Sequence, residues 1–131
     1  MSLMRRRGML AEASGGGEGV SVEWIPGKHV NSSGNVNSSF ISKNESTGCT
    51  PFEVAPGQTV TLTNTDPDWV APWAYIAFYK NDASHTMIYP RHEGVNVHSY
   101  SWTAPSDAVL CRCSIWMRMD DSLDTMRIYL S

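Results

Sequence analysis

The chain is poor in cysteine and has no long hydrophobic run, and each shortage excludes a class of protein. Its three cysteines are too few for a disulfide framework. Cys111 and Cys113 lie two residues apart, so on a strand they share one face, which is a poor geometry for a bridge. We expect free thiols that pack as small apolar side chains. The longest mainly apolar stretch, residues 69–79, is too short to span a bilayer, so no membrane insertion is expected.

Recognisable catalytic and metal-binding motifs are also missing. The sequence has no HExxH, no GxSxG and no Cys/His pair at ligand spacing. Turn and loop chemistry explains the acidic loop at residues 66–68 and the charged segment 91–93, although two aspartate-containing loops could share a calcium ion. The sequence therefore predicts a protein that is no enzyme and binds no metal or cofactor. A glycan-cleaving enzyme with two paired carboxylates is an alternative from a different class.

Positive charge is concentrated at the start of the chain. Residues 1–19 carry three arginines against two glutamates, whereas the remainder carries seven Lys and Arg against eleven Asp and Glu. An acidic body argues against nucleic acid as the partner. The apolar segment at residues 8–11 is too short for a signal peptide. Residues 1–19, which end among glycines, are predicted to be an N-terminal arm and Gly-rich linker, and residues 20–131 a single domain.

The alternation of polar and apolar residues that is typical of β-strands recurs along the chain. Residues 52–54 alternate, Pro56-Gly57 breaks the pattern, and residues 59–63 alternate again, which predicts a hairpin. About nine short strands occur at the spacing of a sandwich or barrel. We therefore predict an all-β antiparallel β-sandwich of jelly-roll type. The other strands are expected at residues 22–24 paired with 28–30, 40–41, 73–79, 87–89, 97–102, 108–119 and 125–130, with a charged loop at 90–94.

The same alternation assigns an inward and an outward face to each strand. The odd-numbered residues of 109–117 and the even-numbered residues of 126–130 are apolar and are expected in the core, together with Ile76 and Phe78. The opposite face presents aromatic rings and arginines: Trp73, Tyr75, Tyr79, Arg112, Trp116 and Arg118.

An aromatic and basic face of this kind has the chemistry of a sugar-binding surface. Aromatic rings stack on the apolar faces of pyranose rings, and polar side chains bind the hydroxyl groups. The face could instead pack on the chain's own loops or on another subunit. Trp69 follows an acidic turn and is either an exposed ligand anchor or part of a loop that plugs the sandwich. The candidate ligand-binding residues are Trp69, Trp73, Tyr79, Arg112 and Trp116.

Four segments, in order from Trp24 to the end of the chain, resemble a β-sandwich domain of tail-fibre and receptor-binding proteins of phages and prophages of gut bacteria. They are residues 27–34 (GKHVNSSG), 52–58 (FEVAPGQ), 76–82 (IAFYKND) and 101–105 (SWTAP), the last followed by Ala108 and Arg112. The chain departs from the family pattern at Lys80, where an aspartate is common. Cys111 and Cys113 also stand where bulkier apolar residues are usual.

The resemblance implies a jelly-roll-like adhesion or carbohydrate-recognition module and transfers no catalytic residues. It implies a virion tail protein made in the bacterial cytoplasm, whose N-terminal arm threads into a homo-oligomer, often a trimer. We therefore expect a non-enzymatic tail-associated module that binds a cell-surface glycan of the host. The alternative is a structural virion subunit whose aromatic face is an oligomer interface and binds no glycan.

Overall fold

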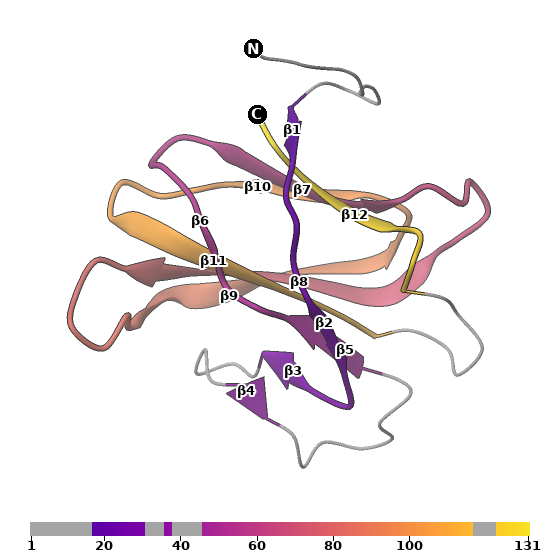
Figure 1. Ribbon diagram of the computed structural model, residues 1–131, viewed down its shortest axis with the longest axis horizontal. Coiled ribbons are helices and arrows are strands. Elements are labelled where there is room, and N and C mark those ends of the chain that lie inside the picture. Colours follow the sequence, from indigo (N-terminus) through magenta and orange to yellow (C-terminus); the bar gives the residue numbers. More distant parts are fainter. Residues whose placement is uncertain (1–16, 31–35, 38–45, 117–122) are drawn as a thin grey trace.

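The computed structural model describes residues 17–30, 36–37, 46–116 and 123–131, which form strands and their connections (Figure 1). No helix that could cross a membrane occurs in these ranges. The strands are β1 (Glu18–Gly19), β2 (Trp24–Pro26), β3 (His29–Val30), β4 (Val36–Asn37), β5 (Ser46–Cys49), β6 (Phe52–Glu53), β7 (Thr59–Asn64), β8 (Ala71–Lys80), β9 (Met87–Val97), β10 (Tyr100–Thr103), β11 (Ala108–Trp116) and β12 (Met126–Leu130).

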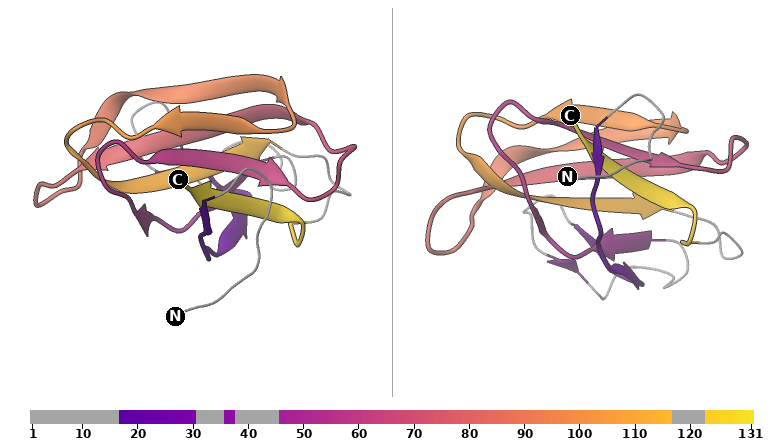
Figure 2. Two further views of the ribbon diagram at one scale, coloured as in Figure 1. Left: turned by 90° about the horizontal axis from the view of Figure 1, so that it is seen from above. Right: turned by 45° about the horizontal axis from the view of Figure 1, so that its top comes forward.

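Two antiparallel sheets enclose the core. Sheet A has the order β1-β12-β7-β10, and sheet B has the order β2-β5-β11-β8-β9 with β6 also paired to β11. Strands β3 and β4 form a separate small ladder. The views of Figure 2 show the strands stacked in layers, and the core cluster joins Leu62 and Ile128 of sheet A to Phe78 and Ile115 of sheet B. The predicted all-β, sandwich-like class is confirmed, while its jelly-roll connectivity stays a prediction.

The inward and outward faces predicted for the main strands are confirmed for the described residues, apart from one bulge, whereas Met117 and Arg118 lie outside the described residues. The fully buried side chains include Ile76, Phe78, Cys111, Cys113, Ile115 and Ile128. The pairing of β11 with β8 shifts register between Ala108 and Leu110. Ala108 consequently takes the buried position, and Val109 is only half-buried. A bulge inserts a residue locally, so strict alternation misassigns the residue beside it.

The hairpin predicted around Pro56-Gly57 is wrong, because its two strands lie in different sheets. Strand β6 pairs with β11 in sheet B, whereas β7 pairs with β10 and β12 in sheet A. The turn itself is present: the Gln58 amide donates to the Ala55 carbonyl at 3.1 Å, and Gly57 has φ +86°. Proline followed by a left-handed glycine is typical of a type II turn. Alternation and turn residues define two strands but do not choose their partners.

Three further expectations about strands are corrected. The strands around Pro26-Gly27 do not pair with each other, because β2 pairs with β5 and β3 with β4. Residues 90–94 are no loop but the middle of β9, an edge strand. Charged residues and Pro90 are compatible with an edge position, where one row of backbone groups is unpaired. The expected strand 97–102 is divided between β9 and β10, and the strand expected at 40–41 lies outside the described residues.

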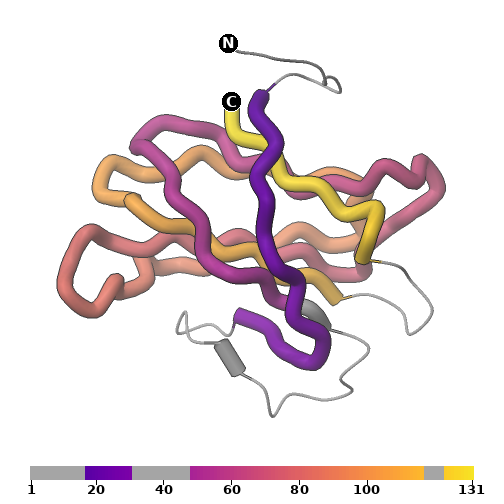
Figure 3. The backbone as a smooth tube through the Cα atoms, in the orientation of Figure 1, coloured from indigo at the N-terminus to yellow at the C-terminus, as the bar shows by residue number. Residues whose placement is uncertain are grey.

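The sandwich begins before residue 20. Glu18 and Gly19 pair with Leu130 and Tyr129 of β12, so the end of the predicted linker belongs to sheet A. Figure 3 shows the chain continuing from there across the molecule to β2, beside β5 of sheet B. Residues 20–23 make this crossing and link edge strand β1 of sheet A to edge strand β2 of sheet B. The rest of the predicted arm, residues 1–16, lies outside the described ranges.

Candidate functional site

The outer face of sheet B carries two tryptophans in direct contact. Trp73 of β8 and Trp116 of β11 are paired across neighbouring strands, and Val95 of β9 is paired with Trp73 on its other side. The two indole rings are stacked, with their centroids 4.6 Å apart and their planes 22° apart. Both rings are half-buried, and Val95 is 54 % exposed. We call Trp73 and Trp116 the tryptophan pair.

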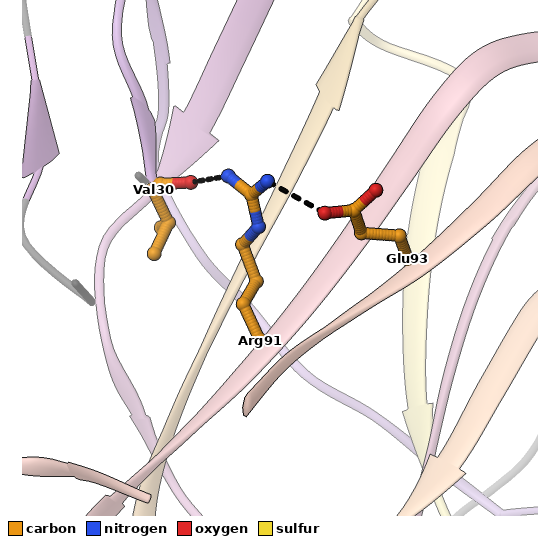
Figure 4. A network of polar contacts seen from close by, with 3 residues as sticks. All are labelled: Val30, Arg91 and Glu93. Carbon is orange, nitrogen blue, oxygen red and sulfur yellow. Dashed lines mark hydrogen bonds and ion pairs between the residues drawn. The ribbon is translucent and has the colours of Figure 1, made fainter. Parts of the chain in front are cut away.

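A polar row lies beside the tryptophan pair on the same face. Tyr75 of β8 is paired with Glu93 of β9, and the Arg91 guanidinium lies 4.2 Å from the centroid of the Tyr75 ring. Arg91 Nη1 donates to the Val30 carbonyl oxygen at 2.6 Å, and Nη2 forms a 2.7 Å ion pair with Glu93 (Figure 4). The Arg91 side chain is 14 % exposed and that of Glu93 45 %. Glu93 is therefore the polar side chain of this network that remains accessible.

The far end of the same face is covered by the chain itself. Val30 of β3 packs with Ala77 and Tyr79 of β8, and Tyr79 is buried. Burial raises the pKa of Tyr79 to about 12, against the opposing effect of the Arg112 guanidinium. At Gly48 of β5 an added Cβ would lie 3.4 Å from the Lys28 carbonyl oxygen. The segment at residues 28–30, which we call the cover, therefore also lies close to β5.

Tyr79 and Arg112 are therefore poorly placed as ligand contacts. The Arg112 guanidinium lies 6.0 Å from the Tyr79 ring centroid, and Arg112 Nε is buried without a hydrogen bond to the described residues. The sequence left open that this face packs on the chain's own loops. Such packing occurs around Tyr79, where Val30 lies against the face. The tryptophan pair lies beyond the cover, with Tyr75 and Glu93 next to it.

Trp69 is separated from the other candidates, because its side chain belongs to the main core. It is buried, and its carbonyl oxygen lies 2.8 Å from His98 Nδ1. Its loop plugs the sandwich and presents no exposed ring, so the expectation of a ligand anchor at Trp69 is not supported by its position. In the sequence, a loop tryptophan is compatible both with an exposed ligand anchor and with a plug of the sandwich. Only the burial of its side chain in the structure distinguishes the two.

A second aromatic contact, which the sequence did not predict, lies at the open edge between the sheets. Trp102 of β10 stacks on His92 of β9, with ring centroids 4.1 Å and planes 15° apart, and Trp102 is 44 % exposed. Burial lowers the pKa of His92. The sequence predicts a loop at residues 90–94, and a loop gives His92 no inward face, so the contact could not be foreseen. As a strand, these residues place His92 inward opposite Ile76.

The aspartates of the loops make the hydrogen bonds of tight turns. Asp66 Oδ1 accepts from the Asp68 amide at 3.0 Å, and Asp82 Oδ1 accepts from the Thr86 amide at 2.9 Å. The bond from the Thr86 amide is the main cause that lowers the pKa of Asp82. In the ranges that the structure describes, no group of three or more His, Cys, Asp or Glu could hold a metal ion.

The chain shows no match to a protein-family model, a curated protein or a solved structure. The resemblance to phage tail domains therefore stays a prediction from the residues that carry it.

Proposed function

We propose that this protein is a non-enzymatic, phage or prophage tail-associated module of jelly-roll type that binds host-surface carbohydrate. The observation that carries the proposal is the stacked tryptophan pair, Trp73 and Trp116, on the outer face of sheet B. The two rings cover each other's facing sides, so the accessible apolar surface is the half-exposed remainder of the pair together with exposed Val95 at its edge. Pyranose rings have apolar faces of C–H groups, which pack well against indole rings.

Hydrogen-bonding groups beside the tryptophan pair support the same ligand class. Tyr75 and Glu93 lie two residues further along their strands, roughly 7 Å away at the rise of a β-strand. A carboxylate accepts hydrogen bonds from sugar hydroxyls, and a phenol both donates and accepts. Arg91 holds Glu93 in place through the 2.7 Å ion pair. An apolar platform with an oriented acceptor at its side is suited to a neutral sugar.

The proposed site is narrower than the one expected from the sequence. It keeps Trp73 and Trp116 and adds Tyr75 and Glu93. It leaves out the buried Trp69 and Tyr79, and also Arg112, which lies beside the Tyr79 ring. It needs no metal or cofactor, and the proposed location is the virion tail after synthesis in the bacterial cytoplasm.

A structural virion subunit is the second candidate, and edge strand β9 supports it. Val95 is 54 % exposed, Tyr89 of the same strand is exposed as well, and β9 closes one edge of sheet B. An exposed edge strand with apolar side chains can pair with another chain. In this candidate the protein is a homo-oligomer, a trimer in particular, and the tryptophan pair lies in the interface. Light scattering tests it, because a monodisperse monomer contradicts it.

A glycan array with bacterial cell-wall and capsule sugars tests the first proposal. We expect binding of at least one glycan, and at least a tenfold loss of affinity for it in Trp73→Ala, about 1.4 kcal/mol. Trp102→Ala is the matched control, because it removes a partly exposed tryptophan from β10, the edge strand of the other sheet, sheet A. Equal affinity in the wild type and Trp73→Ala would remove the proposed site.

A further inference from the structure

A hollow lies away from the tryptophan pair, where the chain crosses from sheet A to sheet B (Figure 3). It has a volume of about 560 Å³ and lies between the crossing segment, residues 20–23, and strand β12. This volume is in the range of roughly 300–1,000 Å³ that is usual for small-molecule sites. The crossing segment is held at both ends, because the Val20 amide donates to the Ile128 carbonyl of β12 at 2.9 Å and the Glu23 amide donates to Oγ1 of Thr50, the residue after β5, at 3.0 Å. Hydrogen bonds therefore fix both ends of the crossing segment, which forms one wall of the hollow.

Apolar side chains form part of the lining of this hollow. Val20 and Val22 alternate with exposed Ser21 and Glu23, and both valines are half-buried against the core. Trp24, at the start of β2, lines the hollow as well and is half-buried. The accessible lining as a whole is more polar than apolar, so Trp24 and the two valines form only part of the wall. A sugar needs both kinds of surface, because its C–H faces are apolar and its hydroxyl groups form hydrogen bonds.

The rim carries a fixed donor next to an acid. Arg127 Nη1 donates to the carbonyl oxygens of Asp124 and Met126, at 2.7 Å each. Nε and Nη2 of this exposed arginine make no hydrogen bond with the part of the chain that the structure describes. A guanidinium held by two carbonyls is pre-oriented, so its free N–H groups lose little entropy when they bind a ligand. Asp124 lines the same rim, which balances the positive charge.

We infer that this hollow is a second carbohydrate site, which accepts one neutral pyranose unit. The inference rests on the proposed carbohydrate-binding function for its ligand class but uses other residues. The sugar ring packs against Trp24 and Val22, and Arg127 donates to its hydroxyl or ring oxygens. The carboxylate of Asp124 at the rim disfavours a strongly anionic ligand, so a neutral sugar fits better than a uronic acid.

Amide and indole chemical shifts of the full chain separate the two sites. We would titrate the wild type with the methyl glycosides of glucose, galactose and N-acetylglucosamine, and with methyl glucuronide. We expect shifts at residues 20–22 and 124–128, saturation that is separate from any shifts of the Trp73 and Trp116 indoles, and no tighter binding of the glucuronide. Arg127→Gln should weaken binding at the hollow about tenfold. Lys80→Gln, the same change of charge on an exposed residue away from the hollow, should not.

Each other outcome contradicts a stated part of the inference. Shifts confined to the Trp73 and Trp116 indoles would overturn the second site and leave the proposed function standing. Shifts confined to the hollow would support the second site and overturn the role of the tryptophan pair. Tighter binding of the glucuronide would overturn the assignment to a neutral sugar. No shift with any of the glycosides would overturn the second site, and the glycan array would then decide the proposed function by itself.

Discussion

The three cysteines lie in one buried cluster of the core, and this environment determines the reactivity of each thiol. Cys49 of β5 lies against Cys113 of β11, whose amide donates to Cys49 Sγ at 3.3 Å, and Cys111 is fully buried in the same cluster. The hydrogen bond to Cys113 and burial raise the pKa of Cys49, and burial raises that of Cys113. The expectation of free, buried thiols is confirmed for all three.

Thiol labelling checks this arrangement. The thiolate is the reactive form, and a raised pKa together with burial keeps the thiol neutral and inaccessible. We expect a thiol reagent at mildly alkaline pH to leave the native protein unmodified and to modify all three cysteines once denaturant is added. Rapid labelling of the native protein would contradict the buried cluster.

His92 makes stability depend on pH. Burial lowers its pKa in the folded protein, so below the ordinary value of about 6.5 the unfolded chain binds a proton more readily than the folded one. Its contribution to stability is therefore complete above about pH 6.5 and is lost as the pH falls. We expect the free energy of unfolding from denaturant titrations to fall between neutral and mildly acidic pH, and to fall less in His92→Gln. Identical slopes for the two proteins would contradict the assignment to His92.

At the scale of elements, edge strand β9 ties the cover to sheet B. Its Arg91 contacts the Val30 backbone, the Tyr75 ring and Glu93 at once. The sequence offered only a charged triplet next to a proline here, which is also the composition of a loop. An edge strand tolerates both features, so local composition could not distinguish the two.

Two substitutions separate the contributions of Arg91. Its hydrogen bond to the Val30 carbonyl is shielded, and hydrogen bonds of charged groups contribute about 1.5–3 kcal/mol. Its ion pair with the partly exposed Glu93 contributes about 0–1 kcal/mol. We expect Arg91→Lys to lower the free energy of unfolding by about 1–3 kcal/mol and Glu93→Gln by less than about 1 kcal/mol. Equal losses would show that the ion pair, and not the contact with the cover, stabilises this edge.

Gly94 in β9 allows Tyr100 to pack over the strand. An added Cβ would lie 2.5 Å from Tyr100 Cδ1, closer than such atoms approach. We expect Gly94→Ala to destabilise the protein by about 1–3 kcal/mol through overpacking, measured by chemical denaturation. Gly19→Ala is the control, because its Cβ would meet only the Tyr129 ring at 4.0 Å. A neutral Gly94→Ala would show that the Tyr100 ring moves aside freely.

At the scale of the whole molecule, the sequence determines the faces of strands better than their partners. Alternation placed Phe78 and Ile115 inward, and both are fully buried. It could not show that the turn at Pro56-Gly57 joins two sheets, because a turn within a sheet and one between sheets use the same residues. It also could not foresee that Val30, distant in sequence, would cover Tyr79. Such contacts depend on long-range packing, which leaves no local pattern.

The same limit applies to the candidate site. Trp73 and Trp116 were expected on one outward face, and the register of β8 against β11 brings them into contact. Trp69 and Tyr79 were candidates because they are aromatic, yet one lies in the core and the other lies under the cover. Aromatic residues serve both packing and binding, so residue type alone could not separate the two roles.

Calorimetric titration with the best glycan of the array tests the central claim most directly. The measurement compares the wild type with the Trp73→Ala/Trp116→Ala double variant and with Trp102→Ala, each shown to be folded by circular dichroism. The account predicts that the double variant loses measurable binding, while Trp102→Ala keeps the wild-type affinity. Wild-type affinity in a folded double variant would contradict a carbohydrate site on the tryptophan pair.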